Sequence, residues 1–177
     1  MNKLGIIVPY RNRRTHLNHF TTSIKNHFNK SKIDYELIIV EQSDELPFNR
    51  GSLLNIGVNK AKELGCNYIV LHDVDMIPST AVDYSIVDRP THLATNFISN
   101  HYKKQKRIVF DEYFGGVTMF PINDYYHING YSNKYWGWGY EDDDLLWRCK
   151  ENFTDFNKKE LPLNSHSSAA LKLNGYT

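Results

Sequence analysis

Three short apolar runs, each followed by a polar loop, constrain the fold of this chain more than any other feature. They are residues 4–8, 35–40 and 68–71, and all three are rich in Ile, Val and Leu or Tyr. Apolar residues then recur at helical spacing in two stretches, first Leu17, Phe20, Ile24 and Phe28, and later Leu53, Leu54, Val58, Ala61 and Leu64. Apolar strands that alternate with one-sided helices predict an α/β fold, with a mostly parallel sheet covered on both faces.

The chain has the length and composition of one compact domain. It has 177 residues, of which 41% are hydrophobic, and no shift in composition marks a second unit. We therefore expect a single domain over residues 1–177, with a partly mobile polar tail at 167–177. Behind Pro90 the pattern becomes mixed, with a last helix expected near Glu141. Short candidate strands lie at 92–97, 108–110 and 117–120.

Positive and negative charges are balanced in this sequence. Lys and Arg number 21 against 20 Asp and Glu, so the net charge of +1 predicts no broad surface for nucleic acid or an anionic membrane. The apolar run after Met1 is too short for a signal-peptide core or a membrane span. If the chain is full length, we expect a cytoplasmic protein. Cys66 and Cys149 form no metal-binding or redox spacing and are expected to be buried free thiols.

Two aspartates, Asp73 and Asp75, directly follow the third apolar run. Both should lie near the carboxyl end of a buried strand, where parallel sheets bind their ligands. Carboxylates there suit a hard divalent cation such as manganese or magnesium, which commonly joins a protein carboxylate to nucleotide phosphates. Paired aspartates also often end a strand and cap a turn, so both explanations stay open. Pro78 is expected to end regular structure in this segment.

A second cluster, YWGWGYEDDD at residues 135–144, alternates tryptophan with glycine and ends in four acids. Acids in a first helical turn suit the helix dipole, and one of them can serve as the N-cap. Tryptophans beside Gly137 and Gly139 fit a packed core poorly, because glycine leaves the backbone around them loose. They favour a lid that closes on a sugar, whose C–H face packs well against indole.

Arginines follow the first two strands in the segments Pro9–Arg13 and Phe48–Gly51. At one edge of a parallel sheet they suit nucleotide phosphates, although solvated surface arginine is the commoner explanation for each alone. Among the histidines, His166 lies in a polar context and is a candidate metal ligand. The three histidines of the first helix are expected on its surface, namely His16, His19 and His27.

Taken together, PYRNR, FNRGSLLNIG, HDVDMIP, YFGGV, INGYSNKYWGWGYEDDD and the late His166 resemble the catalytic domain of the β-1,4-galactosyltransferase family, glycosyltransferase family 7. The resemblance runs from about Ile6 to His166. It implies a GT-A nucleotide-sugar fold, a manganese ion with magnesium as the alternative, and a UDP-sugar donor. It also implies a glycan or lipid-linked sugar acceptor and inversion to a β-linked product. Without a membrane anchor, a minimal bacterial or viral member is expected.

The resemblance also implies a role for each matched residue. Asp75 and His166 would hold the metal, and Asp142 would be the catalytic base, with Asp143 and Gly116 on the acceptor side. The matched donor-binding residues are Arg11, Arg13, Phe48, Arg50, Asp73, Lys103, Tyr113, Trp138 and Glu141. Tyr113 implies galactose as the transferred sugar, since a tyrosine there fills the space that an acetamido group needs.

Three departures from the family pattern bear on activity. Leu163 stands where the family commonly has a methionine ligand, so either a weaker metal affinity is expected or Asn164 or water completes the metal shell. Tyr140 stands where the family usually has a glycine inside the lid. The chain also ends soon after His166, so an abbreviated acceptor site is expected.

Two other functions are alternatives to sugar transfer. A catalytically weak or inactive relative that binds UDP-sugars or glycans would explain Leu163 and the short tail, but binding alone does not need the full EDDD set. A nucleotidyltransferase would need a glycine-rich phosphate loop near the N-terminus, and PYRNR is not one.

Overall fold

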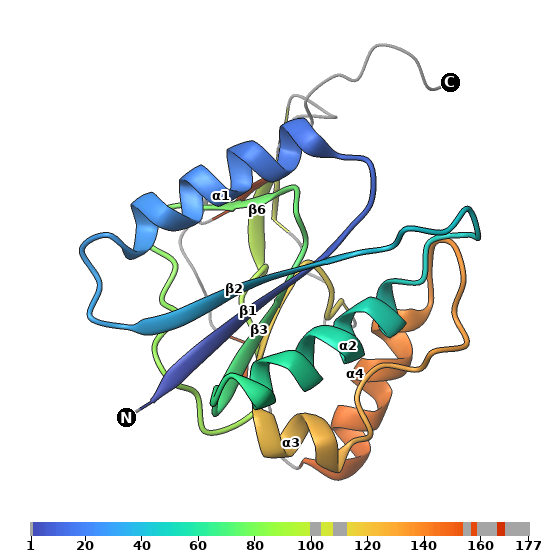
Figure 1. The fold of residues 1–177 in the computed structure, drawn as a ribbon. Helices are drawn as coiled ribbons and strands as arrows, with labels where there is room; N and C mark the ends of the chain where they lie inside the picture. Colours follow the sequence, from blue (N-terminus) through green and yellow to red (C-terminus); the bar gives the residue numbers. More distant parts are fainter. Residues whose placement is uncertain (1, 100–103, 108–112, 154–156, 159–165, 169–177) are drawn as a thin grey trace.

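A six-stranded mixed sheet forms the centre of the molecule in the computed structural model, which describes residues 2–99, 104–107, 113–153, 157–158 and 166–168 (Figure 1). Its strand order is β2-β1-β3-β8-β5-β9. The bounds are β1 Lys3–Tyr10, β2 Asp34–Glu41, β3 Tyr68–His72, β5 Thr91–His92, β8 Val117–Pro121 and β9 Asn157–Lys158. Strand β1 is parallel to β2 and β3, whereas β8 is antiparallel to β3 and β5. The predicted parallel front part and mixed rear part are therefore confirmed.

Helices cover both faces of this sheet (Figure 1). Their bounds are α1 Arg14–Phe28, α2 Arg50–Glu63, α3 Ile122–His127 and α4 Glu141–Asn152. Alternation along β1 divides the core in two. Ile6 and Val8 belong to the core that holds Phe20 of α1, whereas Ile7 belongs to the core that holds Leu54 of α2.

Helix α2 lies close to the sheet because a glycine faces it. A Cβ added at Gly57 would lie 2.3 Å from Ile7 Cγ2 and 3.1 Å from Val40 Cγ2, so only glycine fits there without a shift. The helix begins after Asn49, whose side chain accepts a hydrogen bond from Ser52 N at 2.9 Å. Its first turn is thereby fixed beside the carboxyl ends of β1 and β3.

A second, four-stranded sheet has the order β4-β10-β6-β7. Its strands are β4 Met76–Pro78, β6 Asn96–Ser99, β7 Lys104–Arg107 and β10 His166–Ser168. Regular structure in this segment ends at Pro78, as expected, although the short strand β4 before it was not expected. A proline is tolerated as the last residue of an edge strand, where its missing N–H is not needed. The backbone of His166 pairs with Pro78, which brings it beside the segment that follows Asp75.

Other differences from the sequence expectations are local. The strand expected at 92–97 is split between β5 and β6, and the short helix α3 was not expected because six residues show little periodicity. His16 is only 6% exposed, so its assignment to the helix surface was wrong. The strand expected at 108–110 and residues 169–177 of the expected mobile tail lie outside the described residues.

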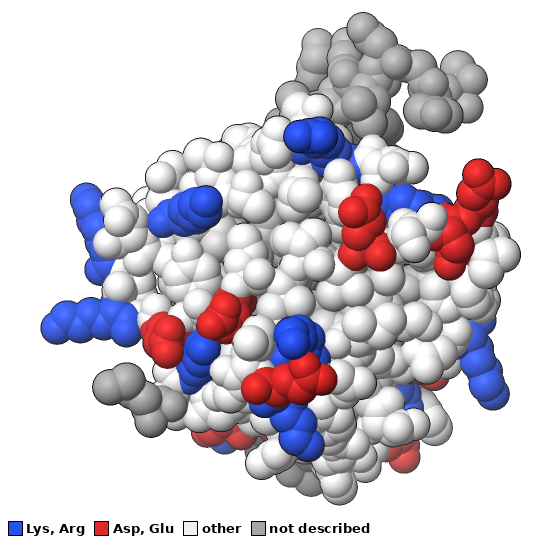
Figure 2. Space-filling view, in the orientation of Figure 1, with Lys and Arg blue, Asp and Glu red and all other residues white. Residues whose placement is uncertain are grey.

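The surface carries no dominant charge on the face shown in Figure 2, where basic and acidic side chains are interspersed. This agrees with the balanced composition. Cys66 and Cys149 are buried free thiols, as predicted. None of the helices in the described part of the chain has the length and apolarity that crossing a bilayer requires.

Candidate active site

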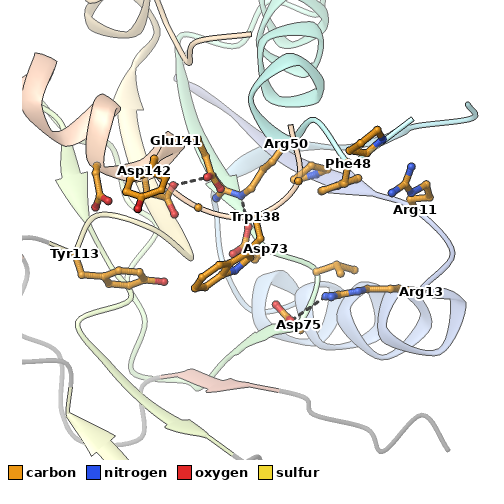
Figure 3. A pocket seen from close by; sticks show the side chains of 17 residues that line it. Arg11, Arg13, Phe48, Arg50, Asp73, Asp75, Tyr113, Trp138, Glu141 and Asp142 are labelled. Atoms are coloured by element: carbon orange, nitrogen blue, oxygen red, sulfur yellow. Dashed lines mark hydrogen bonds and ion pairs between the residues drawn. The ribbon is translucent and has the colours of Figure 1, made fainter. Parts of the chain in front are cut away.

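A cleft of about 760 Å³ opens at the ends of β1, β2 and β3 (Figure 3). It lies between the loops that follow these strands and the start of α4. Most predicted site residues line it. The lining includes Arg11, Arg13, Phe48, Arg50, Asp73, Asp75, Tyr113, Trp138, Glu141, Asp142 and Asp143. The carboxyl ends of parallel strands meet at one edge of a sheet, which explains how residues so far apart in sequence converge here.

One half of the cleft is formed by cationic and aromatic side chains. The Arg11 guanidinium lies 5.4 Å from the centre of the Phe48 ring, and Arg13 Nη1 donates to Asp75 Oδ2 at 3.0 Å. Figure 3 shows these residues on the side of the cleft opposite Asp142, Glu141 and Tyr113. Exposed guanidinium groups beside a flat ring can pair with phosphate oxygens and stack on a base.

Arg50 joins the two halves of the cleft. This buried side chain starts α2, and its Nε donates to Asp73 Oδ1 at 2.9 Å while its Nη1 donates to Asp142 Oδ1 at 2.8 Å. Burial alone would disfavour the charged guanidinium, but Asp142 and Asp73 raise the pKa of Arg50. Its positive charge therefore holds two carboxylates that are far apart in the sequence.

Negative charge gathers around Asp73. Burial raises the pKa of Asp73 to about 6, against the opposing effect of Arg50 and with the help of Asp75 and Asp142. The three neighbouring carboxylates carry more negative charge than their ion-pair partners Arg13 and Arg50 neutralise, which favours binding of a further cation. Oxygen ligands of this kind suit manganese or magnesium. Asp73 and Asp75 therefore fit a divalent cation, although the side chains that the structure describes form no complete set of three His, Cys, Asp or Glu ligands.

The start of α4 lies at the floor of the cleft. All four acids of EDDD fall in its first turn, where the helix dipole favours negative charge. None of them is the N-cap, contrary to the sequence expectation. The N-cap is Tyr140, which has a left-handed φ of 70° and makes no side-chain capping hydrogen bond. The acids are therefore free of a capping role, and Asp142 faces the cleft (Figure 3).

The lid segment, residues 137–140, lies open. Trp138 is 99% exposed, and Gly137 and Gly139 have φ values of 89° and 108°, which only glycine adopts readily. Gly137 N donates to Phe48 O at 2.8 Å, which ties one end of the lid to the loop that carries Phe48 and Arg50. An exposed indole between flexible glycines agrees with the predicted lid.

Two family models match this chain. One, described as the N-terminal region of glycosyl transferase group 7, matches residues 1–86, and the other, described as the N-terminal domain of galactosyltransferase, matches residues 95–162. The chain belongs to glycosyl transferase group 7. It is 36% identical over 150 residues to xylosylprotein 4-beta-galactosyltransferase of Caenorhabditis elegans, which covers 83% of this chain. It is 37% identical over 152 residues to beta-1,4-galactosyltransferase 4 of Mus musculus, which covers 85%.

A solved group 7 structure has the same fold. It is a mutant of Drosophila β-1,4-galactosyltransferase 7 in complex with manganese, UDP-Gal and xylobiose, with a TM-score of 0.83 and 26% identity. The match covers 96% of this chain and 71% of that one, and confirms the GT-A fold. The chain spans 50% and 43% of the lengths of the two relatives named above. These relatives are animal proteins, so the expected bacterial or viral origin finds no support in them.

Among the described residues that the family resemblance implied, Gly116 is not part of the cleft lining. Gly116 lies beside it: its carbonyl accepts from Asp73 N at 2.8 Å, and a Cβ added at Gly116 would lie 3.1 Å from the Tyr113 hydroxyl. Lys103 lies outside the described residues, as do Leu163 and Asn164. His166 is described by its backbone only, and the roles of these residues stay predictions.

Tyr131 belongs to the site but was not expected there. Its buried hydroxyl lies 2.6 Å from Asp142 Oδ1 and 3.0 Å from Arg50 Nη1. The residue stands within the segment INGYSNKYWGWGYEDDD that carries the family resemblance, but nothing in its local sequence indicates a polar partner. A tyrosine in a glycine-rich turn is as readily explained by packing.

Proposed function

We propose that this chain, as a single catalytic domain, transfers a hexose from a UDP-sugar to a hydroxyl of a sugar acceptor with inversion at the anomeric carbon. The observation that carries the proposal is Asp142, a partly exposed carboxylate that faces the cationic half of the cleft and is fixed by Arg50. A nucleotide diphosphate bound among the arginines would leave its sugar between them and Asp142 (Figure 3).

Inverting transfer is a single displacement. The acceptor hydroxyl attacks the anomeric carbon from the side opposite UDP, the new C–O bond forms as the bond to the diphosphate breaks, and Asp142 takes the hydroxyl proton. Arg11 and Arg13 would bind the diphosphate, with the uracil beside Phe48. Closure of Trp138 over the donor would exclude water, the competing nucleophile.

A divalent cation fits this scheme. We propose manganese, with magnesium as the alternative, held by Asp75 and His166 with Asp73 nearby. When bound, the cation would supply Lewis-acid stabilisation of the charge that develops on the departing diphosphate. Manganese accompanies UDP-Gal in the solved Drosophila relative, which supports this assignment.

Galactose is the proposed sugar. Tyr113 lines the cleft beside Gly115 and Asp142, and its ring packs edge-on against His92 with 5.4 Å between ring centres. A side chain held in this way fills space that an N-acetyl group would need. The two relatives compared above are both galactosyltransferases, which supports this choice.

The test replaces Asp142 with asparagine. Calorimetry of UDP and UDP-galactose, with and without manganese, first establishes the donor site in the unmodified protein. Asp142→Asn should then lose at least about 100-fold in turnover, which is the usual contribution of a general base, while UDP affinity stays unchanged. Turnover near the unmodified level would remove Asp142 from the role of base. Absence of UDP binding under both conditions would refute the donor site itself.

A further inference from the structure

The Tyr131 hydroxyl closes a three-membered hydrogen-bond network at the start of α4. Arg50 Nη1 donates to Tyr131 Oη at 3.0 Å and to Asp142 Oδ1 at 2.8 Å, and Tyr131 Oη donates to Asp142 Oδ1 at 2.6 Å. Tyr131 is 2% exposed, and the Arg50 guanidinium lies 5.2 Å from the centre of its ring. The contact between Arg50 and Tyr131 is therefore buried, and the two contacts to Asp142 are partly buried, which strengthens hydrogen bonds to a charged group.

The direction of the short hydrogen bond follows from protonation. Burial raises the pKa of the Tyr131 phenol, so the hydroxyl keeps its proton in the physiological range. A guanidinium can only donate, and an ionised carboxylate can only accept. Tyr131 therefore accepts from Arg50 and donates to Asp142, and each of the three groups is satisfied.

The two carboxylate oxygens of Asp142 differ in their hydrogen bonds. Oδ1 receives both donors, whereas Oδ2 takes part in none of the hydrogen bonds found among the described residues and lies against Gly115. A carboxylate with one oxygen fixed and the other open can accept a proton only on the open side. Oδ2 is thus the oxygen left for an incoming hydroxyl.

We propose that Tyr131 is a positioning residue for Asp142: its hydroxyl fixes Oδ1 and thereby presents Oδ2 to the acceptor hydroxyl. The inference rests on the proposed function, because it assigns Tyr131 a role only through the base. The role proposed for Tyr131 differs from that of Arg50. Arg50 binds Asp73 as well as Asp142, whereas of these two carboxylates Tyr131 contacts only Asp142.

Tyr131 can position another group because its own backbone is held from both sides. Asn55 Nδ2 donates to Tyr131 O at 2.8 Å, and Asn55 Oδ1 accepts from Tyr131 N at 3.1 Å. The same Oδ1 accepts from the Tyr125 hydroxyl at 2.7 Å. Asn55 lies on α2, which also carries Arg50. The helix therefore fixes Tyr131 relative to Arg50.

The matched pair of variants is Tyr131→Phe and Tyr125→Phe. Each removes one buried hydroxyl and leaves the ring, but only the Tyr131 hydroxyl contacts Asp142. The Tyr125 hydroxyl donates to Asn55 Oδ1 and accepts from Tyr131 N at 3.2 Å, and in Tyr125→Phe the two hydrogen bonds from Asn55 still hold the Tyr131 backbone. We expect Tyr131→Phe to lower kcat roughly 10- to 100-fold, which corresponds to loss of a charged hydrogen bond and of the orientation it gives. The KM values and UDP affinity should stay within about 2-fold, because substrate binding does not use this hydroxyl.

The control separates positioning from general loss of structure. Tyr125→Phe should lower the thermal midpoint at least as much as Tyr131→Phe and change kcat far less. Equal losses of kcat in the two variants, or an unchanged kcat in Tyr131→Phe, would overturn the inference. A second check adds Tyr131→Phe to Asp142→Asn. A positioning residue that acts only through Asp142 causes no further loss there, so an additional loss would also overturn it.

The outcomes for the two proposals can be told apart. If the unmodified protein transfers no sugar from UDP-galactose, the proposed function fails and the base that Tyr131 would position has no role. If the unmodified protein transfers sugar and Asp142→Asn does not, the function stands. The comparison of Tyr131→Phe with Tyr125→Phe then tests Tyr131 alone.

Discussion

Gly115 faces the Asp142 carboxylate at a distance that leaves no room for a side chain. An added Cβ would lie 2.2 Å from Asp142 Oδ2 and 2.9 Å from Asp142 Cγ. The backbone has little freedom to retreat, because Gly115 O accepts from Val117 N at 2.9 Å and lies 2.8 Å from His92 Nε2. Ordinary contact begins at 3.4 Å, so in Gly115→Ala the carboxylate must move by about 1.2 Å.

A displacement of this size should be far more damaging to turnover than to folding. Misplacing a reacting group by 1 Å costs on the order of 100-fold in rate, so we expect kcat for transfer to fall about 100-fold in Gly115→Ala. UDP affinity should be unchanged, because Arg11, Arg13 and Phe48 lie across the cleft from Asp142 (Figure 3). The assay is steady-state transfer at saturating donor and acceptor, with UDP calorimetry and thermal melting on the same samples.

Gly65→Ala is the matched control. Gly65 has a φ of 78° and no atom within 4 Å of an added Cβ, so alanine there suffers backbone strain without a clash. It should lose about 1 kcal/mol of unfolding free energy and keep its kcat. Normal kcat in Gly115→Ala would show that the Asp142 carboxylate is not constrained from this side. A parallel loss of UDP binding would mean that the damage is not confined to the base.

Three further outcomes follow from the described contacts. Tyr140→Gly should raise the free energy of unfolding by roughly 0.5–1 kcal/mol, because glycine adopts the left-handed φ of 70° at this position without strain. Tyr140→Ala should give no such gain, and thermal melting of both variants tests this. Burial raises the pKa of Cys149 to about 12 and also raises that of Cys66, so both thiols should react with a thiol reagent at pH 8 only as fast as the protein opens; rapid labelling would contradict their burial. Burial lowers the pKa of His72 from 6.5 to about 4, so the unfolded chain binds more protons between these values and stability should fall as pH drops through this window. Urea unfolding of His72→Gln should show a shallower dependence over the same range, and an equal slope would refute the assignment.

The front of the fold was predictable because its signals are local. Residues 4–8 predicted a strand that the structure extends to Lys3–Tyr10, and the helical spacing of Phe20, Ile24 and Phe28 marked α1 closely. The rear depends on pairings between distant segments. Strand β4 exists because β10 pairs with it, and neither segment is long enough to show a period of two.

In the candidate site, too, local sequence signals were predictive and contacts between distant segments were not. Placement after apolar strands, together with the family resemblance, predicted that Arg13, Arg50, Asp75 and Asp142 line one cleft. The sequence did not predict that Arg50 donates hydrogen bonds to two protein carboxylates, Asp73 and Asp142. Nor did it reveal Tyr131, because its hydroxyl meets Arg50 at the start of α2 and Asp142 at the start of α4 only in the folded chain.

The span of the Arg50 contacts has a consequence for folding kinetics. Asp73 lies 23 residues from Arg50 along the chain, and Asp142 lies 92 residues away. Contacts of high sequence separation form late, because the loop entropy must be lost before they contribute. The parallel strands and α2 can assemble before α4 docks, so during refolding the native circular dichroism should return ahead of enzymatic activity. The rate at which turnover recovers would then measure the rate at which α4 docks, the final step of folding.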